Sequence, residues 1–325
     1  MQLLRVVDDA SRRAALAKGA ELLRAGRLVA FPTETVYGLG ANALDEAAVE
    51  RIYDAKGRPA INPVIVHVGS AAAARELALE WPAAADAIAR AFWPGPVTIV
   101  VRKRAVVPDI VSAGGDTVGL RVPAHPLALA LLEQAGVPVA APSANLSTQV
   151  SPTTAEHVAR GLGDRVDLII DGGATTVGIE STVVDVTDDV PRILRPGMIA
   201  HDAIARVVGA TKAAGDFVAT GVPRSPGTMD KHYSPRARVR LVPPGGLNES
   251  LAELPNGGRV GALSFDTVAA DVFRIMPRDP QEYARVLYAA LHEMDDRRCD
   301  VILVERPPGK PEWAAILDRL ERAAR

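Results

Sequence analysis

The chain of 325 residues has little cysteine, few aromatic residues and no long apolar run. Its single cysteine, Cys299, excludes a disulfide framework within the chain and fits a reducing compartment. Aromatic residues make up only 4%, so the core must consist mainly of Ala, Val, Leu and Ile. No apolar run reaches the roughly 18 residues that a membrane-spanning helix needs. The N-terminus becomes charged within a few residues, unlike a signal peptide. We therefore expect a soluble, cytoplasmic protein without membrane contact.

A strong net charge is also missing. The formal net charge is −2 and the isoelectric point is about 6.3. Proteins that hold nucleic acid mainly by charge are usually more basic, so we expect at most weak RNA binding through a local patch. Hydrophobic residues, in contrast, make up 48% of the chain, which indicates a globular protein. The length is sufficient for two domains.

Several short motifs of common enzyme sites are absent. The sequence has no P-loop and no G-x-S-x-G nucleophile elbow. Its six histidines are scattered, without H-x-x-x-H or C-x-x-C spacing, so we expect no metal site formed by protein ligands alone. Magnesium carried by a phosphate substrate stays open. The stretch GLGANA, residues 38–43, resembles a dinucleotide-binding loop only loosely, and we interpret it as a glycine turn.

Strand-like and helix-like segments alternate through the first two thirds of the chain, as is typical of a mixed α/β domain with a twisted sheet. Helices are predicted at 11–26, 44–56, 126–135 and 153–161. Ser11 is the expected cap of the first helix, and Ser151 caps the last, with Pro152 at its first position. Short apolar runs predict strands at 27–31, 63–68, 96–101, 117–122, 137–142, 166–171, 181–186 and 192–195.

The composition changes after residue 210. Residues 211–236 are rich in Gly, Pro, Ser and Thr, and a linker of that length is usually functional or disordered. Beyond it, strands are predicted at 238–242, 259–265, 271–276 and 299–305, and helices at 279–297 and 310–325. The chain is therefore predicted to consist of a first domain (1–210), a linker (211–236) and a smaller α/β domain (237–325).

Two cations, Lys56 and Arg58, flank a glycine where a helix meets an apolar strand. Pro59 and Pro63 stiffen this turn, so the cations are held in place rather than mobile. Ligands of α/β proteins often bind at such junctions. The strand that follows carries His67 among apolar neighbours. These residues indicate a substrate contact, and a solvated turn with a core histidine is the alternative.

Further polar residues occur at other strand ends. The stretch APSANLSTQVSP, residues 141–152, supplies hydroxyls, an amide and backbone N–H groups before a predicted helix, which suits phosphate oxygens. A polar loop with a helix cap is the alternative. Arg121 lies inside an apolar strand and Arg195 is similarly placed. Because a buried arginine must be paired or bind an anion, these loops suit a small acidic ligand.

Together these stretches resemble the YrdC-like family, the L-threonylcarbamoyl-AMP synthases. KGRP with SAN is similar to the family signature K-x-R…S-x-N. Further family stretches follow in family order over about residues 10–205, namely FPTETVYGLGANA, NPVIVHV, FWPGPVTIV, GLRVP, APSANLS, GIESTVVDV and ILRPG. The segment SPGTMDKHYSP and a second domain resemble the long, two-domain form, whose members often carry P-G-M-K-Y at this point.

The resemblance implies a YrdC-like twisted mixed sheet with flanking helices, plus a smaller Rossmann-like α/β C-terminal domain. It implies a nucleotidyltransferase that converts L-threonine, bicarbonate and ATP, with Mg²⁺ on the phosphates, into threonylcarbamoyl-AMP and pyrophosphate. The product then serves a downstream threonylcarbamoyl-transferase of tRNA modification. An RNA-binding module without catalysis and a carbamoyl-transfer domain of hydrogenase maturation are the alternatives. The near-neutral charge argues against the first, and the missing zinc-finger cysteines argue against the second.

The resemblance also implies roles for individual residues. The signature residues expected around the reacting phosphates are Lys56, Arg58, Ser143 and Asn145. The expected threonine ligands are Thr35, His67, Arg121 and Ser181. The expected ATP contacts are Arg58, Asn62, Thr117, Ser143, Ser151, Arg195 and Tyr233. Arg121 is the expected partner of the threonine carboxylate, and the linker is expected to fold over the nucleotide as a lid with Tyr233 near the phosphates.

Overall fold

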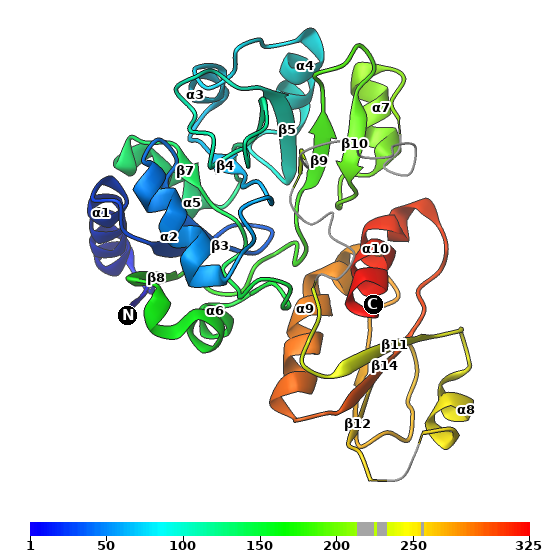
Figure 1. Ribbon diagram of the computed structural model, residues 1–325. Helices are drawn as coiled ribbons and strands as arrows, with labels where there is room; N and C mark the ends of the chain where they lie inside the picture. Colours follow the sequence, from blue (N-terminus) through cyan, green and yellow to red (C-terminus); the bar gives the residue numbers. More distant parts are fainter. Residues whose placement is uncertain (213–223, 226–232, 255–256) are drawn as a thin grey trace.

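The computed structural model describes residues 1–325 with the exception of 213–223, 226–232 and 255–256. The described residues form two α/β units that lie side by side (Figure 1). The helices and strands of the first unit lie between Gln2 and Val208, and those of the C-terminal unit lie between Arg238 and Ala323. Most of the predicted linker lies outside the described residues.

Ten strands of the described residues form a single mixed sheet in the first unit, in the order β1-β8-β2-β3-β7-β4-β6-β5-β9-β10. The strands are β1 (Gln2–Arg5), β2 (Val29–Pro32), β3 (Tyr37–Asn42), β4 (Val66–His67), β5 (Val97–Arg102), β6 (Thr117–Arg121), β7 (Val139–Ala140), β8 (Leu168–Asp171), β9 (Thr182–Asp185) and β10 (Arg192–Arg195). Parallel and antiparallel neighbours alternate irregularly, and most of these strands are buried along their length, so the sheet forms the centre of the unit.

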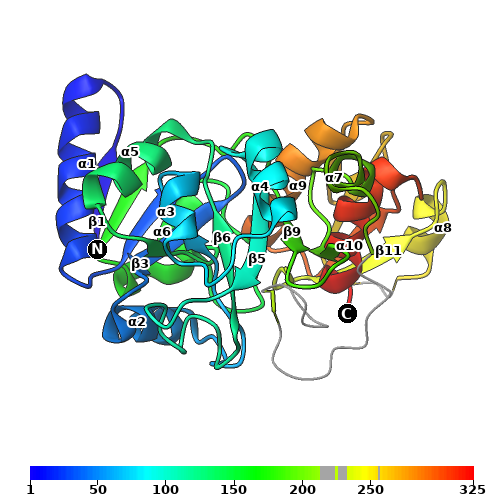
Figure 2. The ribbon, with the colours of Figure 1, turned by 90° about the horizontal axis from the view of Figure 1, so that it is seen from above.

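Helices cover this sheet. They are α1 (Asp9–Arg24), α2 (Glu46–Lys56), α3 (Ala71–Arg75), α4 (Ala83–Phe92), α5 (Pro126–Ala135), α6 (Ala155–Leu162) and α7 (His201–Val208). Figure 2 shows α1 and α5 side by side at the N-terminal end. Their buried leucines, among them Leu23 and Leu131, share one apolar cluster with Ile170 of β8. A second, larger cluster contains Ile52 of α2, and these two layers fix the sheet from both sides.

Among the described residues of the C-terminal unit, four parallel strands form a sheet in the order β11-β14-β12-β13. These strands are β11 (Arg238–Val242), β12 (Val260–Ser264), β13 (Val272–Ile275) and β14 (Val301–Glu305), and the helices are α8 (Leu247–Ala252), α9 (Pro280–Asp296) and α10 (Ala314–Ala323). In Figure 1, α9 and α10 lie on the side that faces the first unit, and α8 lies on the far side. This confirms a smaller Rossmann-like α/β unit after the YrdC-like sheet.

The predictions of two helix caps and of a glycine turn were wrong. The first helix is capped by Asp8, whose carboxylate accepts from Ser11 N at 2.7 Å, because Ser11 is the third residue of a capping box. The predicted glycine turn 38–43 is mostly strand β3, held by β2 on one side and β7 on the other. Helix α6 is capped by Thr154 instead of Ser151, because the Ser151 hydroxyl donates to Glu180 at 2.6 Å.

The ends of several strands converge in the first unit. His67 at the end of β4 is the register partner of Arg121 at the end of β6, so the two residues lie next to each other. Ser143 follows β7, Ser181 precedes β9, and Arg195 ends β10. The sheet thus gathers residues that are far apart in the sequence. None of the described helices is long and apolar enough to cross a membrane.

Candidate active site

A polar cavity lies where these strand ends meet, on the side that faces the C-terminal unit. It is lined by Thr33, Thr35, Val36, Gly38, Arg58, Ile65, His67, Arg121, Ala141, Pro142, Ser143, Glu180, Ser181, Arg195 and Tyr233. Eight of the thirteen predicted site residues are therefore gathered around one space: Thr35, Arg58, His67, Arg121, Ser143, Ser181, Arg195 and Tyr233. Ligand sites typically combine such a concave surface with a few convergent polar groups.

Arg121 is buried beside the cavity and is held on three sides. Its Nη2 lies 2.7 Å from a carboxylate oxygen of Glu34, which is also buried. Its Nη1 donates to Thr35 Oγ1 at 3.0 Å, and its Nε donates to the Gly95 carbonyl at 3.2 Å. The guanidinium is thus fixed in orientation before any ligand binds, and sequence reasoning missed Glu34 as its partner.

Two further arginines are buried at the same cavity. Arg58 donates to the carbonyls of Asn62 and Pro63 at 3.0 and 2.7 Å, and burial lowers its pKa to about 10. Arg195 donates to the carbonyl of Ser181 at 3.0 Å and to its hydroxyl at 3.1 Å. Burial also lowers the pKa of Arg195, although Tyr233 and Glu180 act in the opposite direction. Both groups keep their charge at neutral pH, so the cavity favours anions.

Neutral polar groups complete the wall. Burial, reinforced by the charge of Arg121, lowers the pKa of His67 to about 3, so the imidazole is neutral at physiological pH. Its Nδ1 is buried and has no hydrogen-bond partner within the described part of the chain. The Ser181 hydroxyl lies 2.8 Å from Thr98 Oγ1. Because buried polar atoms normally have a hydrogen-bond partner, this ring nitrogen on the cavity wall is suited to bond a polar ligand.

Lys56 is buried behind the wall instead of facing the cavity. Its Nζ donates to the carbonyls of Ser143 and Asn145 at 2.5 and 2.6 Å, so it ties the SAN loop to the end of α2. The Asn145 side chain donates to the carbonyls of Leu146 and Gln149, both at 2.8 Å. Both signature residues thus hold the loop that carries Ser143.

The three other predicted residues lie near the cavity. Asn62 accepts the Arg58 hydrogen bond on its carbonyl. Ser151 is connected through Glu180, which lines the cavity. Thr117 lines a small neighbouring cavity that shares Ile65 with the first.

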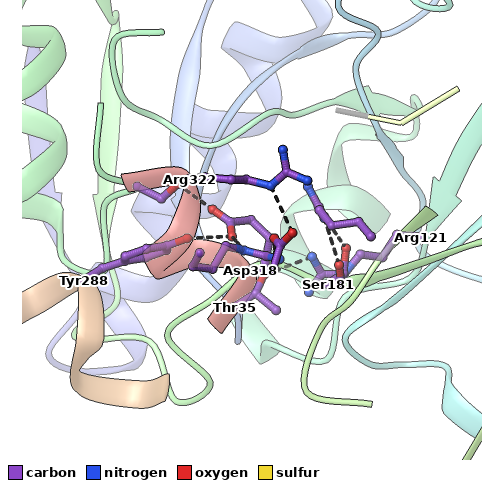
Figure 3. Close-up of polar contacts among 10 residues, drawn as sticks. Thr35, Arg121, Ser181, Tyr288, Asp318 and Arg322 are labelled. Carbon is purple, nitrogen blue, oxygen red and sulfur yellow. Dashed lines mark hydrogen bonds and ion pairs between the residues drawn. The ribbon is translucent and has the colours of Figure 1, made fainter. Parts of the chain in front are cut away.

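Sequence reasoning also missed residues of the C-terminal unit. Glu180 accepts hydrogen bonds from Tyr288 of α9 and Arg319 of α10, both at 2.9 Å. Figure 3 shows Tyr288, Asp318 and Arg322 approaching from one side and Arg121 and Ser181 from the other. In the sequence, Glu180 stands out as the acidic residue of the GIEST stretch, but this stretch does not indicate which residues pair with it.

The cavity is small in this conformation. Its free space is about 50 Å³, which corresponds to one or two water molecules and is well below the roughly 300 Å³ of small ligand sites. Tyr233, which is 1% exposed, occupies part of the wall. A ligand as large as a nucleotide therefore requires surrounding side chains to move.

A larger hollow of about 900 Å³ lies elsewhere on the first unit, beside Val68 and Leu132. Its lining is mainly apolar, and its charged residues, Glu76, Arg104 and Glu133, are exposed. Buried convergent arginines are found at the small cavity and not in the lining of the large one. The small cavity is therefore the candidate active site. The described residues contain no group of three or more metal-ligating side chains.

Family profiles match both units. A profile described as "Telomere recombination", for the Sua5, YciO and YrdC proteins, matches residues 21–197. A profile described as "Threonylcarbamoyl-AMP synthase, C-terminal domain" matches residues 199–325. The two profiles meet near residue 198, and the division at residues 210 and 236 stays a prediction.

Individual relatives agree with these profiles over nearly the whole chain. A threonylcarbamoyl-AMP synthase of Pyrococcus abyssi is 44% identical over 94% of this chain and 92% of its own length. One of Bacillus subtilis is 42% identical over 95% of this chain and 92% of its own length. The crystal structure of P. abyssi Sua5 complexed with L-threonine superposes with a TM-score of 0.91 at 41% identity, over 99% of this chain and 97% of that one.

Proposed function

The chain belongs to the threonylcarbamoyl-AMP synthase family, and we propose that its reaction takes place in the polar cavity at the strand ends of the first unit. It is a nucleotidyltransferase that forms threonylcarbamoyl-AMP, with ATP as a substrate, for the threonylcarbamoyladenosine modification of tRNA. The observation that carries the location is the convergence of three buried arginines, Arg58, Arg121 and Arg195, on one cavity.

The proposed threonine side of the cavity comprises Thr35, His67, Arg121 and Ser181. The P. abyssi relative binds L-threonine. The fixed Arg121 guanidinium suits the threonine carboxylate, because its fork geometry matches two oxygens. The neutral His67 Nδ1 and the Ser181 hydroxyl suit the hydroxyl and amine of threonine. The amine attacks the carbon of bicarbonate and water leaves, which gives a carbamate.

The proposed ATP side comprises Arg58, Asn62, Thr117, Ser143, Ser151, Arg195 and Tyr233. A carbamate oxygen attacks the α-phosphorus and pyrophosphate leaves in line, so the carbamate–phosphate bond forms as the bond to the β-phosphate oxygen breaks. Positioning and electrostatic stabilisation supply most of the rate in such transfers. Arg58 and Arg195 stabilise the charge that develops on the phosphates.

Lys56 and Asn145 act in this proposal by shaping the SAN loop. Because the Lys56 ammonium holds two loop carbonyls, the loop amides and the Ser143 hydroxyl keep their direction towards the phosphates. Burial, followed by repulsion from Arg58, lowers the pKa of Lys56 well below its ordinary value.

We propose that Mg²⁺ enters with ATP, because the carboxylate that lines the cavity, Glu180, is already bonded to Ser151, Tyr288 and Arg319. It supplies charge neutralisation on the phosphates.

The product passes to a downstream threonylcarbamoyl-transferase. A cytoplasmic location fits the single cysteine, and weak RNA contact stays a separate proposal.

Pyrophosphate release is the direct test. Wild-type protein with ATP and Mg²⁺ is expected to release pyrophosphate only when both L-threonine and bicarbonate are present, with threonylcarbamoyl-AMP detected by mass spectrometry. L-Serine, which lacks the methyl group of threonine, serves as the matched substrate control. ATP turnover that is independent of threonine would contradict the proposal.

A further inference from the structure

Glu180 is the point where the C-terminal unit enters the candidate active site. One carboxylate oxygen accepts from the Ser151 hydroxyl at 2.6 Å, within the first unit. The other accepts from Tyr288 OH and Arg319 Nε, each at 2.9 Å, from the C-terminal unit. A single carboxylate therefore connects a predicted ATP contact with two helices of the other unit.

Arg319 is only 1% exposed, although arginine side chains usually lie on the protein surface. Besides Glu180, it pairs with Asp318 at 2.6 Å, and its guanidinium carbon lies 5.1 Å from the ring centroid of Tyr233. The Tyr233 ring in turn stacks against Tyr288, with 5.7 Å between centroids. Arg319 thus packs against Tyr233, which lines the cavity on the proposed ATP side.

The loop that carries Glu180 is fitted closely to α9. A Cβ atom on Gly178 would lie 2.4 Å from the carbonyl oxygen of Ala284 and 2.5 Å from Cα of Arg285, too close for any side chain. Backbone therefore meets backbone two residues before Glu180. This contact fixes the distance between the loop and the C-terminal unit independently of the hydrogen bonds.

Charge also connects the two units at this point. Burial alone would raise the pKa of Glu180, but Arg319 and Arg195 outweigh it and lower the pKa to about 2. Glu180 is therefore ionised throughout the physiological range, and its charge depends on an arginine of the other unit. Breaking one side of a buried ion pair leaves an uncompensated charge, which is costly.

We propose that Arg319 is a positioning residue of the synthase: through Glu180 and Tyr233 it sets the ATP side of the cavity, so the C-terminal unit forms part of the active site. The inference rests on the proposed assignment of Ser151, Arg195 and Tyr233 to ATP. On the threonine side, Arg121 and Glu34 pair within the first unit, and this pair does not involve Arg319.

Arg319→Met tests this directly, because methionine keeps an apolar stem and removes the charge and the donors. We expect the KM for ATP to rise about 10- to 100-fold, the range that corresponds to one charged hydrogen bond. The KM for threonine should change less than about threefold. The matched control is Arg306→Met. It breaks a surface pair between Arg306, which follows β14, and Glu321 of α10, and it should leave both constants unchanged.

A rescue experiment separates positioning from a loss of folding. If Arg319→Met leaves Glu180 as an unpaired buried charge, then the double variant Glu180→Gln/Arg319→Met should recover at least about threefold in kcat/KM for ATP relative to Arg319→Met. Arg319→Met alone should also lose activity towards alkaline pH, because the pKa of Glu180 rises when only Arg195 is left to lower it, and its ionisation then buries a charge without the Arg319 partner. The wild type and Arg306→Met lack this alkaline limb.

The outcomes are distinct. Wild-type protein without threonine-dependent pyrophosphate release would refute the proposed function itself. An active wild type with equal losses in Arg319→Met and Arg306→Met, or with equal rises in both KM values, would overturn the positioning role. If Arg319→Met fails to fold, Glu180→Gln, which removes the charge from the first unit, decides: unchanged KM for ATP would overturn the proposal, and a selective rise would support it.

Discussion

Two buried arginine–carboxylate pairs flank the same cavity, and they are built differently. Arg121 and Glu34 both belong to the first unit, with 2.7 Å between nitrogen and oxygen. Arg319 and Glu180 join the two units, with 2.9 Å between them. The first pair can form when one unit folds, whereas the second forms only when the units are docked.

The difference shows that one side of the cavity can be held within a single unit, while the other side is held only when the two units are docked. Buried ion pairs add little net stability, but each is costly to break from one side. The local pair therefore keeps Arg121 oriented at all times. The interdomain pair makes the orientation of Glu180, and of the Ser151 hydroxyl bonded to it, depend on the C-terminal unit.

The largest effect is expected at the local pair. Arg121→Lys keeps the charge but loses the fork that meets Glu34, Thr35 and a carboxylate ligand. We expect the KM for threonine to rise about 100-fold and the KM for ATP to change little, measured by steady-state pyrophosphate release. Arg102→Lys, at an exposed ion pair on β5, is the matched control. Equal rises in both constants would make Arg121 a structural residue.

The phosphate assignment of Arg58 is tested by Arg58→Ala. Pyrophosphate formation at low ATP should fall about 10- to 100-fold, because a charged contact is lost in the transition state. Arg58 also holds the carbonyls of Asn62 and Pro63, so the melting temperature is measured alongside. Turnover close to the wild type at low ATP would exclude Arg58 as a phosphate ligand.

The close approach of the two units can be probed with glycines. Gly178 and Gly173 have positive φ of +84° and +85°, so alanine is strained equally at both. Only at Gly178 would the new Cβ collide with α9, whereas nothing lies within 4 Å of it at Gly173. We expect Gly178→Ala to lose about tenfold in kcat/KM for ATP and Gly173→Ala to lose less than threefold. Equal losses would show that strain alone matters.

The smallest effect concerns pH. His157 of α6 stacks on His292 of α9 with 3.9 Å between centroids, and burial lowers the pKa of both rings, to about 3 for His157. Since the separated rings bind protons near pH 6.5, docking should weaken as the pH falls from about 7 towards 3.

The charged groups around these rings also bear on that prediction. Arg160 opposes protonation of both rings, and Asp295 and Asp296 favour it at His292. Hydrogen exchange of α9 at pH 7.5 and 5.5 measures the effect, and His292→Phe, which keeps the stacking, is expected to reduce it. Exchange that is equally pH-dependent in that variant would assign the effect to other groups.

The sequence predicted the elements of the first unit well where apolar periodicity was clear. Helix α5 was predicted at 126–135 and is found there, because Pro126 starts it and Gly136, with a φ of +65°, ends it. Strand lengths were less predictable. Residues 63–68 were expected to form one strand, but only Val66–His67 pair in the sheet. Pairing depends on neighbours that a local pattern does not contain.

The site shows the same limit. Motif resemblance indicated Arg121 and Ser181, because both lie in distinctive local stretches, and both line the cavity. It did not indicate Glu34 as the partner of Arg121, or Arg319 as the partner of Glu180. The second pair spans 139 residues of sequence, and only the docking of two folded units brings it together.

Calorimetric titration tests the central comparison most directly. L-Threonine and a non-hydrolysable ATP analogue are titrated separately into wild type, Arg121→Lys and Arg319→Met. If the two pairs serve separate halves of the site, Arg121→Lys loses threonine affinity and keeps the affinity for the analogue, whereas Arg319→Met shows the reverse. If both variants lose affinity for the same ligand to the same extent, the cavity has no separate local and interdomain halves, which would contradict the roles proposed for Arg121 and Arg319.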